Sequence, residues 1–374
     1  MMRVAILFLG DPSFDSRTTR FAEALRDAKC DVFIIGVRSP GSSVEKIPSR
    51  YLLRLVFQSG GLRFFEYFLR SFFALLLHKR FHMVLSADLY SLPAAFLLAL
   101  FHHSTLIYDS RELYSATAAL ASRPLVQRFW TGVERFLAPR CDVVLTVNNS
   151  IAEILRASLH RAVAVVRNVP KYINPRMGAT EESLRVHLGI QPEIPILLYQ
   201  GGLQQGRGLF IMLDIAERLS EVACVFLGSG PLRDSLAREI CVRGLQQRAF
   251  ILNAIPVSEL LKFTFGATLG ISLIENRGKS YLLSLPNKVF EYIMAGVPVI
   301  ASNFPEMRLL IEKYQVGIVA DPEDIPMIVQ KIRELLSSPS KLKELKENCF
   351  RAAMELNWEK ESALFLNAIG IQRL

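Results

Sequence analysis

Short apolar runs recur along the whole chain, and segments whose apolar residues fall at helical spacing separate them. Runs of this kind that are rich in β-branched residues predict buried strands, and their alternation with helices predicts a parallel α/β architecture. The chain opens with a strand at 4–10, a polar loop, a helix at 20–28 and a strand at 31–37. Such an opening begins a doubly wound sheet, which binds ligands at the loops after its strands. Further strands of the first half are predicted at 83–87, 105–109, 143–147 and 163–166.

The pattern pauses at residues 167–178, a stretch rich in Asn, Pro and Gly that predicts a linker. It then restarts, so we expect two similar α/β halves with a ligand cleft between them. A length of 374 residues also favours two domains over one. Strands of the second half are predicted at 196–201, 222–230, 249–253, 268–274, 297–302 and 316–320, and helices at 326–336, 341–356 and 360–369.

Residues 282–309 form the stretch around which the rest of the chain is predicted to be organised. Pro286 precedes a short amphipathic helix predicted over 287–295, and a glycine and a proline then separate this helix from the next strand. A helix N-terminus offers unpaired N–H groups and a positive dipole end, which suits a phosphate. Lys288 in the first turn is unfavourable for the dipole alone, so it predicts an anionic ligand.

Positive charge is concentrated in the first half of the chain. The net charge is +9, and residues 1–170 carry 21 Lys and Arg against 13 Asp and Glu, whereas the remainder carries 23 against 22. This asymmetry predicts an anionic partner for the first half, either a membrane surface or a phosphorylated acceptor. Nucleic acid is not expected, because no nucleic-acid-binding motif accompanies the charge.

The segment Arg50–Arg80 interleaves basic residues with phenylalanine and leucine. A basic amphipathic helix with aromatic residues is typical of proteins that lie on an anionic membrane. The alternative is a core helix of the first domain with solvated arginines, since core-facing helices show the same stripe. The basic residues within the segment are Arg54, Arg63, Arg70, Lys79 and Arg80.

Cysteine usage and the lengths of the apolar runs indicate the compartment. The five cysteines form no CxxC pair, which favours free thiols in a reducing cytoplasm over a disulfide framework or a zinc site. No secretory signal is evident, and the apolar runs at 72–77 and 92–101 are too short to cross a bilayer. We therefore expect a cytoplasmic protein, peripheral on the inner face of the membrane. The cysteines are Cys30, Cys141, Cys224, Cys241 and Cys349.

Blocks of sequence in the second half stand in a distinctive order and spacing, and weaker ones precede them in the first half. The blocks are YQGGLQQGRGL (199–209), VFLGSGPLRDSL (225–236), SLPNKVFEYIMAGVPVIAS (284–302) and LNWEKES (356–362), with FDSR (14–17), ADLYSLPAA (87–95), LIYDSREL (106–113) and VVRNVP (165–170) before them. Together they resemble the retaining glycosyltransferases of the GT-B fold, of the family 4 or group 1 type.

The resemblance implies two Rossmann-like doubly wound domains that face a cleft. It implies an acceptor-binding domain over 1–170, a linker region over 171–194 and a donor-binding domain over 195–355. The last segment, 356–374, is expected to return as a helix to the first domain.

The resemblance also implies how a nucleoside diphosphate sugar is held. Glu291 inherits the glutamate that grips the ribose, and Arg207 and Lys288 become the two cations that face the diphosphate, with backbone amides near Gly202 and Asn287. Departing diphosphate gains charge in the transition state, so these cations are predicted to be catalytic. For Arg207 the alternative is a solvated loop arginine, and for Glu291 a capping or salt-bridging residue on a surface helix.

Other positions of the second half carry weaker implications. Gly228 and Gly230 are expected to allow close backbone approach to the ligand, or else to form a plain turn, and Ile255 and Pro256 lie where the family meets the base. Leu283 stands where many members have an additional glutamate. This departure puts the contact to the donor sugar in doubt, and Glu275 and Asn276 are possible substitutes.

In the first half, Arg111 stands where the family often has a histidine close to the donor sugar. Arg111 is expected to be catalytic, through a contact to sugar hydroxyls or phosphate, and the alternative is a structural Arg111–Glu112 neighbourhood. Ser16 and Arg17 map to the loop near the donor phosphate and, with Asp88, are expected on the acceptor side.

The implied reaction is glycosyl transfer with retained configuration to a lipid-linked or polysaccharide acceptor, with no cofactor. No metal site is expected, because the sequence has no DxD triplet and no cluster of ligating residues at metal spacing. Two alternatives stay open at this point: a nucleotide-sugar epimerase of the same fold, and a degenerate partner subunit without catalysis. The base, the sugar and the linkage are not predicted.

Overall fold

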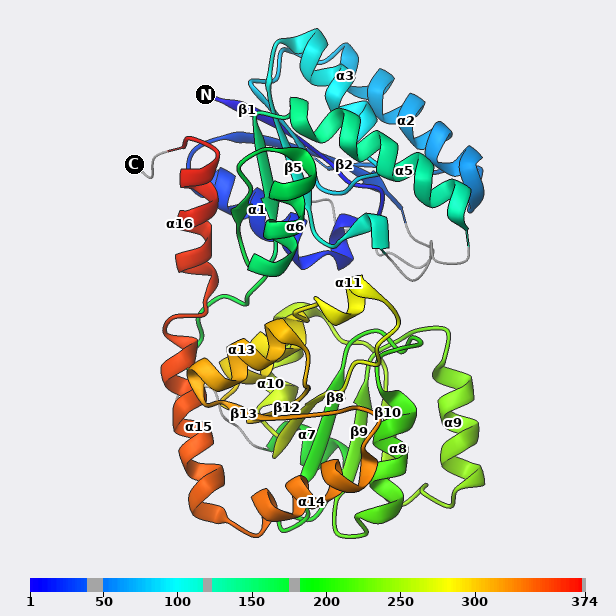
Figure 1. Cartoon of the computed structure of the whole chain (residues 1–374), viewed down its shortest axis with the longest axis vertical. Coiled ribbons are helices and arrows are strands. Elements are labelled where there is room, and N and C mark those ends of the chain that lie inside the picture. Colours follow the sequence, from blue (N-terminus) through cyan, green and yellow to red (C-terminus); the bar gives the residue numbers. More distant parts are fainter. Residues whose placement is uncertain (39–49, 117–122, 175–181, 372–374) are drawn as a thin grey trace. The chain divides into compact units, whose positions relative to one another are not determined.

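A computed structural model describes residues 1–38, 50–116, 123–174 and 182–371. The chain forms two compact units, one of Met1–Asn168 with Glu359–Leu374 and the other of Val169–Trp358. Each unit is built around its own parallel sheet (Figure 1). Residues 175–181 of the predicted linker region lie outside the described residues.

The first unit contains a seven-stranded sheet of order β3-β2-β1-β4-β5-β6-β7, in which every neighbouring pair is parallel. The strands predicted from the apolar runs are found, because strands buried on both faces read as continuous apolar sequence. Their bounds are β1 Arg3–Leu7, β2 Asp31–Val37, β3 Arg50–Leu53, β4 Met83–Ser86, β5 Thr105–Ser110, β6 Val143–Thr146 and β7 Ala164–Val165.

Strand β3 corrects the prediction of one amphipathic helix over Arg50–Arg80. Residues Arg50–Leu53 pair with the end of β2 at the edge of the sheet, and the helix α2 begins only at Gly60. The carboxylate of Glu66 on α2 accepts hydrogen bonds of 2.9 Å from the Val56 and Phe57 amides, which fixes the intervening loop against the helix.

Helices cover both faces of the first sheet. The connections through α2, α3 and α5 all advance across the sheet in one direction, so right-handed crossovers place these helices on one face and α1 on the other. On the side of α1, the Phe21 ring stacks on the Phe365 ring of the C-terminal helix at 4.1 Å. The helices are η1 Pro12–Phe14, α1 Ser16–Asp27, α2 Gly60–Leu76, α3 Leu92–His102, η2 Tyr114–Ala116, α5 Pro124–Leu137, η3 Ala138–Arg140, α6 Asn149–Leu159 and α16 Trp358–Ala368.

The second unit contains a six-stranded parallel sheet of order β10-β9-β8-β11-β12-β13. The strands are β8 Ile196–Gln200, β9 Ala223–Leu227, β10 Ala249–Leu252, β11 Leu269–Ser272, β12 Val299–Ser302 and β13 Gly317–Ala320, and the helices are α7 Glu182–Leu188, α8 Leu209–Arg218, α9 Arg233–Val242, α10 Val257–Thr264, α11 Lys279–Leu282, α12 Asn287–Met294, α13 Pro305–Tyr314, α14 Ile325–Leu336 and α15 Pro339–Ala353.

The strand order of each sheet indicates where ligands bind. The order reverses between β1 and β4 in the first sheet and between β8 and β11 in the second. In open α/β sheets, ligands bind outside the carboxyl ends of the strands at such a switch point. Within the described residues, no helix has both the length and the hydropathy needed to cross a membrane.

Candidate functional site

In the second unit, the site is built around the start of α12. Pro286 occupies the N-cap without a side-chain hydrogen bond to the helix, so side chains leave the first amides of α12 uncapped. Lys288 points inward from the first turn and is only 8% exposed. Its Nζ lies 3.5 Å from the centroid of the ring of Tyr199, the penultimate residue of strand β8. The ring offsets part of the cost of burying the charged amine and leaves its N–H groups for a ligand.

Arg207 lies in the loop between β8 and α8, with its guanidinium carbon 5.2 Å from the centroid of the Tyr281 ring. Burial, and after it the charge of Arg207, lowers the pKa of Lys288 well below its ordinary value, while Glu291 opposes the shift. In the described part of the chain, neither Arg207 nor Lys288 forms an ion pair. Two neighbouring cations that form no ion pair favour an anion beside them.

Glu291 follows Lys288 by one turn of α12, and its carboxylate is held in place. The Gln200 side chain donates a 2.6 Å hydrogen bond to Glu291 Oε2, and the Thr264 hydroxyl donates one of 2.9 Å to Gln200 Oε1. Gln200 and Thr264 are both buried. A fixed carboxylate of this kind accepts hydrogen bonds from adjacent hydroxyls, as on a ribose.

Sequence reasoning did not find Gln200 or Thr264. Gln200 is the last residue of β8, and a polar residue at the carboxyl end of a buried strand at the switch point was the available signal. Thr264 ends α10 and carried no signal in the sequence; its hydroxyl oxygen also lies 2.8 Å from Leu260 O of its own helix.

The predicted glycines serve the protein backbone. A Cβ on Gly228 would lie 1.9 Å from Gly201 O, and one on Gly230 would lie 2.4 Å from Leu203 O. Gly228 and Gly230 therefore let two loops of the protein approach closely, and the approach to a ligand predicted for them stays a prediction. Gly202 is exposed, and its carbonyl accepts a 2.6 Å hydrogen bond from the Tyr199 hydroxyl.

The remaining predicted donor residues lie around the same sheet edge. Asn287 is the exposed first residue of α12, and Ile255 and Pro256 lie between β10 and α10. Leu283 is buried, so the missing second carboxylate is replaced by an apolar core residue. Glu275, a possible substitute for it, pairs with Arg277 at 3.3 Å.

A cavity of about 780 Å³ in the second unit lies elsewhere. It opens beside Thr268 and Pro298, at the amino ends of β11 and β12, whereas Gln200 marks the carboxyl end of the sheet. Parallel sheets bind their ligands at the carboxyl ends, so we do not assign this cavity to the site.

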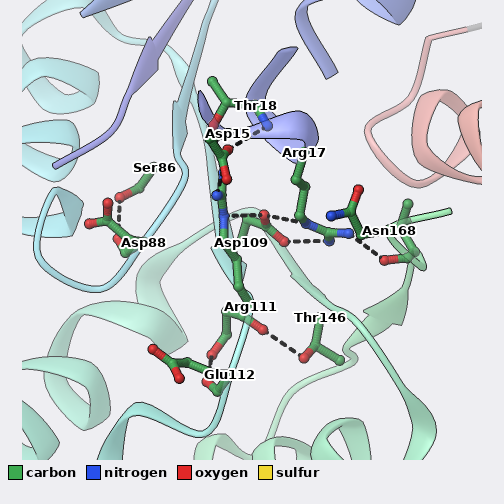
Figure 2. Close-up of polar contacts among 12 residues, drawn as sticks. Asp15, Arg17, Thr18, Ser86, Asp88, Asp109, Arg111, Glu112, Thr146 and Asn168 are labelled. Carbon is green, nitrogen blue, oxygen red and sulfur yellow. Dashed lines mark hydrogen bonds and ion pairs between the residues drawn. The ribbon is translucent and has the colours of Figure 1, made fainter. Parts of the chain in front are cut away.

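In the first unit, two arginines and two aspartates form one network at the carboxyl ends of β1 and β5 (Figure 2). Arg17 binds Asp109 through two hydrogen bonds of 2.7 Å, and Arg111 binds Asp15 at 2.6 Å and Asp109 at 3.3 Å. Burial works to raise the pKa of Asp15, but the Arg111 charge and the Thr18 hydrogen bonds bring it below its ordinary value. The four charges neutralise one another, so the network fixes the loop that begins α1.

This network gives both arginines structural partners, and the ligand contacts predicted for them stay predictions. Arg17 is 2% exposed and also donates a 2.6 Å hydrogen bond to Val166 O. Each of the three guanidinium nitrogens of Arg111 donates a hydrogen bond, and the acceptors are Asp109, Asp15 and Thr18. Its ion pairs run to these aspartates, which makes it a residue that positions α1.

Ser16 and Asp88 also have structural partners. The Ser16 hydroxyl accepts a 3.1 Å hydrogen bond from the Asn168 side chain. Asp88 is buried, and its carboxylate accepts hydrogen bonds from the Leu9 and Ser91 amides at 2.8 and 2.7 Å. Burial raises the pKa of Asp88. The Asp88 carboxylate thus ties β1 to β4, and the acceptor contact predicted for it stays a prediction.

Two family models match the sequence. The one described as glycosyl transferases group 1 matches residues 180–351, and the one described as glycosyl transferase 4-like domain matches residues 15–169. Among curated proteins, the chain is similar to the sulfoquinovosyl transferase SQD2 of Arabidopsis thaliana, with 24% identity over 246 residues. That alignment covers 62% of this chain but only 44% of the relative, so the chain spans less than half of the relative's length.

Solved structures share the fold along the whole chain. The sucrose-phosphate synthase tll1590 of Thermosynechococcus elongatus matches with a TM-score of 0.80 at 18% identity, covering 98% of both chains. Anabaena Alr3699/HepE, solved in complex with UDP-glucose, matches with a TM-score of 0.76 at 13% identity, covering 99% of both chains. The predicted GT-B fold is thus confirmed.

Proposed function

Because the chain belongs to the group 1 glycosyl transferases, we propose that it transfers a glycosyl group from a nucleoside diphosphate sugar to a lipid-linked or polysaccharide acceptor, with retention of configuration. The observation that carries the proposal is the pair of cations at the start of α12. The positive charges of Lys288 and Arg207 repel each other, and neither side chain forms an ion pair within the described residues. Lys288 lies next to the Glu291 carboxylate, which Gln200 holds in place.

The donor diphosphate would bind Lys288, Arg207 and the first amides of α12. An anion at this place would offset the repulsion between the two cations and would raise the pKa of Lys288 again. The amides around Asn287 add the partial positive charge of the helix start. The ribose hydroxyls would donate to Glu291, whose orientation Gln200 fixes.

The two cations would also act in the chemical step. As the bond from the anomeric carbon to the diphosphate oxygen breaks, negative charge grows on the diphosphate, and Lys288 and Arg207 stabilise it. The acceptor hydroxyl attacks from the same face and gives its proton to the leaving phosphate. This route assigns no protein side chain as the base and calls on no cofactor or metal ion.

The acceptor and the location follow from the first half of the chain. We propose that the protein is cytoplasmic and works at the inner membrane face, where lipid-linked acceptors are presented. The Arg50–Arg80 segment supports this through α2, whose exposed side includes Phe65 and Phe73, whereas Arg50–Leu53 belong to the sheet. Arg111 and Arg17 enter the proposal as positioning residues.

Isothermal titration with a panel of nucleoside diphosphates, followed by incubation with labelled donor sugars, tests the proposal. We expect one nucleotide to bind, and the sugar to be transferred only when an acceptor lipid is added. Absence of binding across the panel would identify a partner subunit without catalysis. Conversion of the donor sugar without any acceptor would identify an epimerase, and either outcome would overturn the proposal.

A further inference from the structure

We propose that the first unit docks on an anionic lipid bilayer through the outward sides of α2, α3 and α5, which we call the three-helix face. The inference rests on the proposed function in one respect only: docking would bring the protein to a lipid-linked acceptor. It goes beyond the Arg50–Arg80 segment, because two of the three helices lie outside that segment.

The three helices lie next to one another in the first unit. All three cover the same face of the sheet, and α3 packs against both α2 and α5 (Figure 1). Residues of these helices that point away from the sheet therefore share one surface of the unit.

Helix α2 turns an apolar stripe outward. Tyr67, Ser71 and Leu75 are its buried residues, whereas Phe65 and Phe73 on the other side are 59% and 60% exposed. A surface helix of a soluble protein normally places polar residues on its outer side. Here both sides of the helix are apolar, which indicates that the outer side has a partner.

Helix α3 repeats the arrangement with fewer polar groups. From Leu92 to Phe101 it has no charged side chain, and its outward residues Leu97, Leu100 and Phe101 are all exposed. An exposed apolar helix without charged side chains is typical of a surface that becomes buried when a protein or membrane partner binds.

Helix α5 adds aromatic residues and cations outside the segment singled out from the sequence. Phe129 and Phe136 are exposed, whereas Trp130 and Glu134 on the opposite side are buried. Arg128 and Arg135, which precede these phenylalanines, are exposed. Side chains of this kind insert a ring into the acyl boundary while the guanidinium meets the lipid phosphates.

The charges of the three-helix face fit an anionic surface. The three helices carry two carboxylates: Glu66 pairs with Arg70 at 2.9 Å, and Glu134 is buried on the inner side of α5, where it accepts a 2.7 Å hydrogen bond from the Tyr108 hydroxyl. Exposed cations on α5 and in the segments that flank α2 and α5 attract anionic headgroups. They lie at Arg54, Lys79, Arg80, Arg123, Arg128 and Arg135.

The same charges argue against a second copy of the chain as the occupant. A twofold interface brings the same patch together from both subunits, so Arg128 and Arg135 would meet an equally cationic surface. Like charges juxtaposed across an interface oppose association. A bilayer with anionic lipids satisfies both the rings and the cations.

Co-sedimentation with large vesicles tests the docking. The full chain is mixed with phosphatidylcholine vesicles that contain about 30 mol% phosphatidylglycerol, and with vesicles of phosphatidylcholine alone, at about 0.1 M and about 0.5 M salt. We expect binding to the anionic vesicles at low salt, weaker binding at high salt, and little binding to the neutral vesicles.

Variants of α5 separate this proposal from docking by α2 alone. Phe129→Ser with Phe136→Ser should reduce the vesicle partition coefficient about tenfold or more, and Arg128→Gln with Arg135→Gln should reduce it at low salt only. The matched control is Leu309→Ser on α13 of the second unit, which changes a leucine as exposed as Phe129, at 62% each. Unchanged melting temperatures show that the variants fold.

Several outcomes would overturn the proposal. These are absence of binding by the wild-type chain, equal loss in the Leu309→Ser control, retention of full binding by the α5 variants, and a dimer that the α5 variants dissociate. Donor titration of the same variants keeps the two proposals apart. A chain that binds donor but no vesicles rejects the docking face and leaves the proposed transfer standing. A chain that binds vesicles but no donor rejects the transfer and leaves the docking face standing.

Discussion

Lys288 holds its Nζ 3.5 Å from the centroid of the Tyr199 ring, at the point where the start of α12 meets the end of β8. The ring covers one side of the amine, and burial with the Arg207 charge lowers the pKa of Lys288. The amine is thus kept in a place where its charged form is disfavoured until an anion arrives. This relationship makes proton uptake a signature of donor binding.

Nucleoside diphosphate binding is expected to take up protons in a pH range set by Lys288. The free protein has a lowered pKa at Lys288, and a bound diphosphate raises it, so between these two values the complex holds more protons. Affinity should be constant below the lowered pKa and should fall by about tenfold per pH unit above it. Titration calorimetry in two buffers of different ionisation enthalpy measures the uptake.

The Lys288→Met variant provides the control for proton uptake. Its methionine keeps an apolar stem against Tyr199 but cannot titrate, so the buffer dependence should vanish. Equal uptake by wild type and variant would assign the proton to another group. For folding the sign is opposite: the unfolded chain binds more protons, so this group makes folding more favourable as pH rises towards the ordinary lysine pKa.

Gln200→Leu is expected to weaken nucleotide binding by releasing Glu291. Leucine fills the buried position but donates nothing to Glu291 Oε2, which now accepts a 2.6 Å hydrogen bond. Affinity should fall about 5- to 10-fold for a ribonucleoside diphosphate and little for the 2′,3′-dideoxy analogue. An equal loss for both nucleotides would show that Gln200 does not act through the ribose hydroxyls.

Glu134→Gln is expected to stabilise the first unit at neutral pH. Burial raises the pKa of Glu134, so its contribution to stability is intact below the ordinary glutamate pKa and is lost as pH rises through the raised value. The variant removes this loss, at about 1.4 kcal/mol for each unit by which the pKa is raised. Scanning calorimetry from about pH 4 to pH 8 should show a gain in melting temperature that grows with pH.

Glu66→Gln is the control of opposite sign. The Val56 and Phe57 amides lower the pKa of Glu66, so its contribution is present at neutral pH and lost in acid. Its variant should melt at a lower temperature than wild type at neutral pH and equally in acid. The same pH trend in both variants would contradict the assignment of these shifts.

Arg17→Met is expected to destabilise the first unit by about 3–5 kcal/mol, because it leaves the Asp109 carboxylate buried without its partner. Adding Asp109→Leu should recover much of the loss, since it removes the unpaired charge. The partly exposed pair of Arg3 and Asp31 gives the comparison, and Arg3→Met should cost about 1 kcal/mol or less. Urea denaturation measures all three, and a small effect of Arg17→Met would contradict the structural role.

The parallel sheets and the helix that carries Lys288 could be predicted from sequence because they rest on local pattern. Strand 31–37 is observed with those bounds, and the helix predicted over 287–295 is observed as Asn287–Met294. Strand β3 was missed because its four residues lie at the sheet edge and run directly into the basic apolar pattern that precedes α2.

The side-chain networks could not be predicted, because they join residues far apart in the chain. Asp109 meets Arg17 across 92 positions, and Gln200 meets Glu291 across 91. Only the sheet topology brings these pairs together, so sequence gave Arg17 and Arg111 the roles of ligand contacts. Residue type at a motif position indicates which chemistry is possible there, whereas the partners decide whether it is available.

The central claim is that the start of α12 and the loop after β8 hold a diphosphate. The most direct test is to titrate the nucleoside diphosphate that the wild-type protein binds into the double variant Arg207→Ala with Lys288→Ala. The double variant should lose about 100-fold or more in affinity for the nucleoside diphosphate and little for the unphosphorylated nucleoside. Lys313→Ala, which removes a lysine 4.9 Å from the Tyr314 ring, should bind as wild type does. Unchanged diphosphate affinity in the double variant would contradict the account.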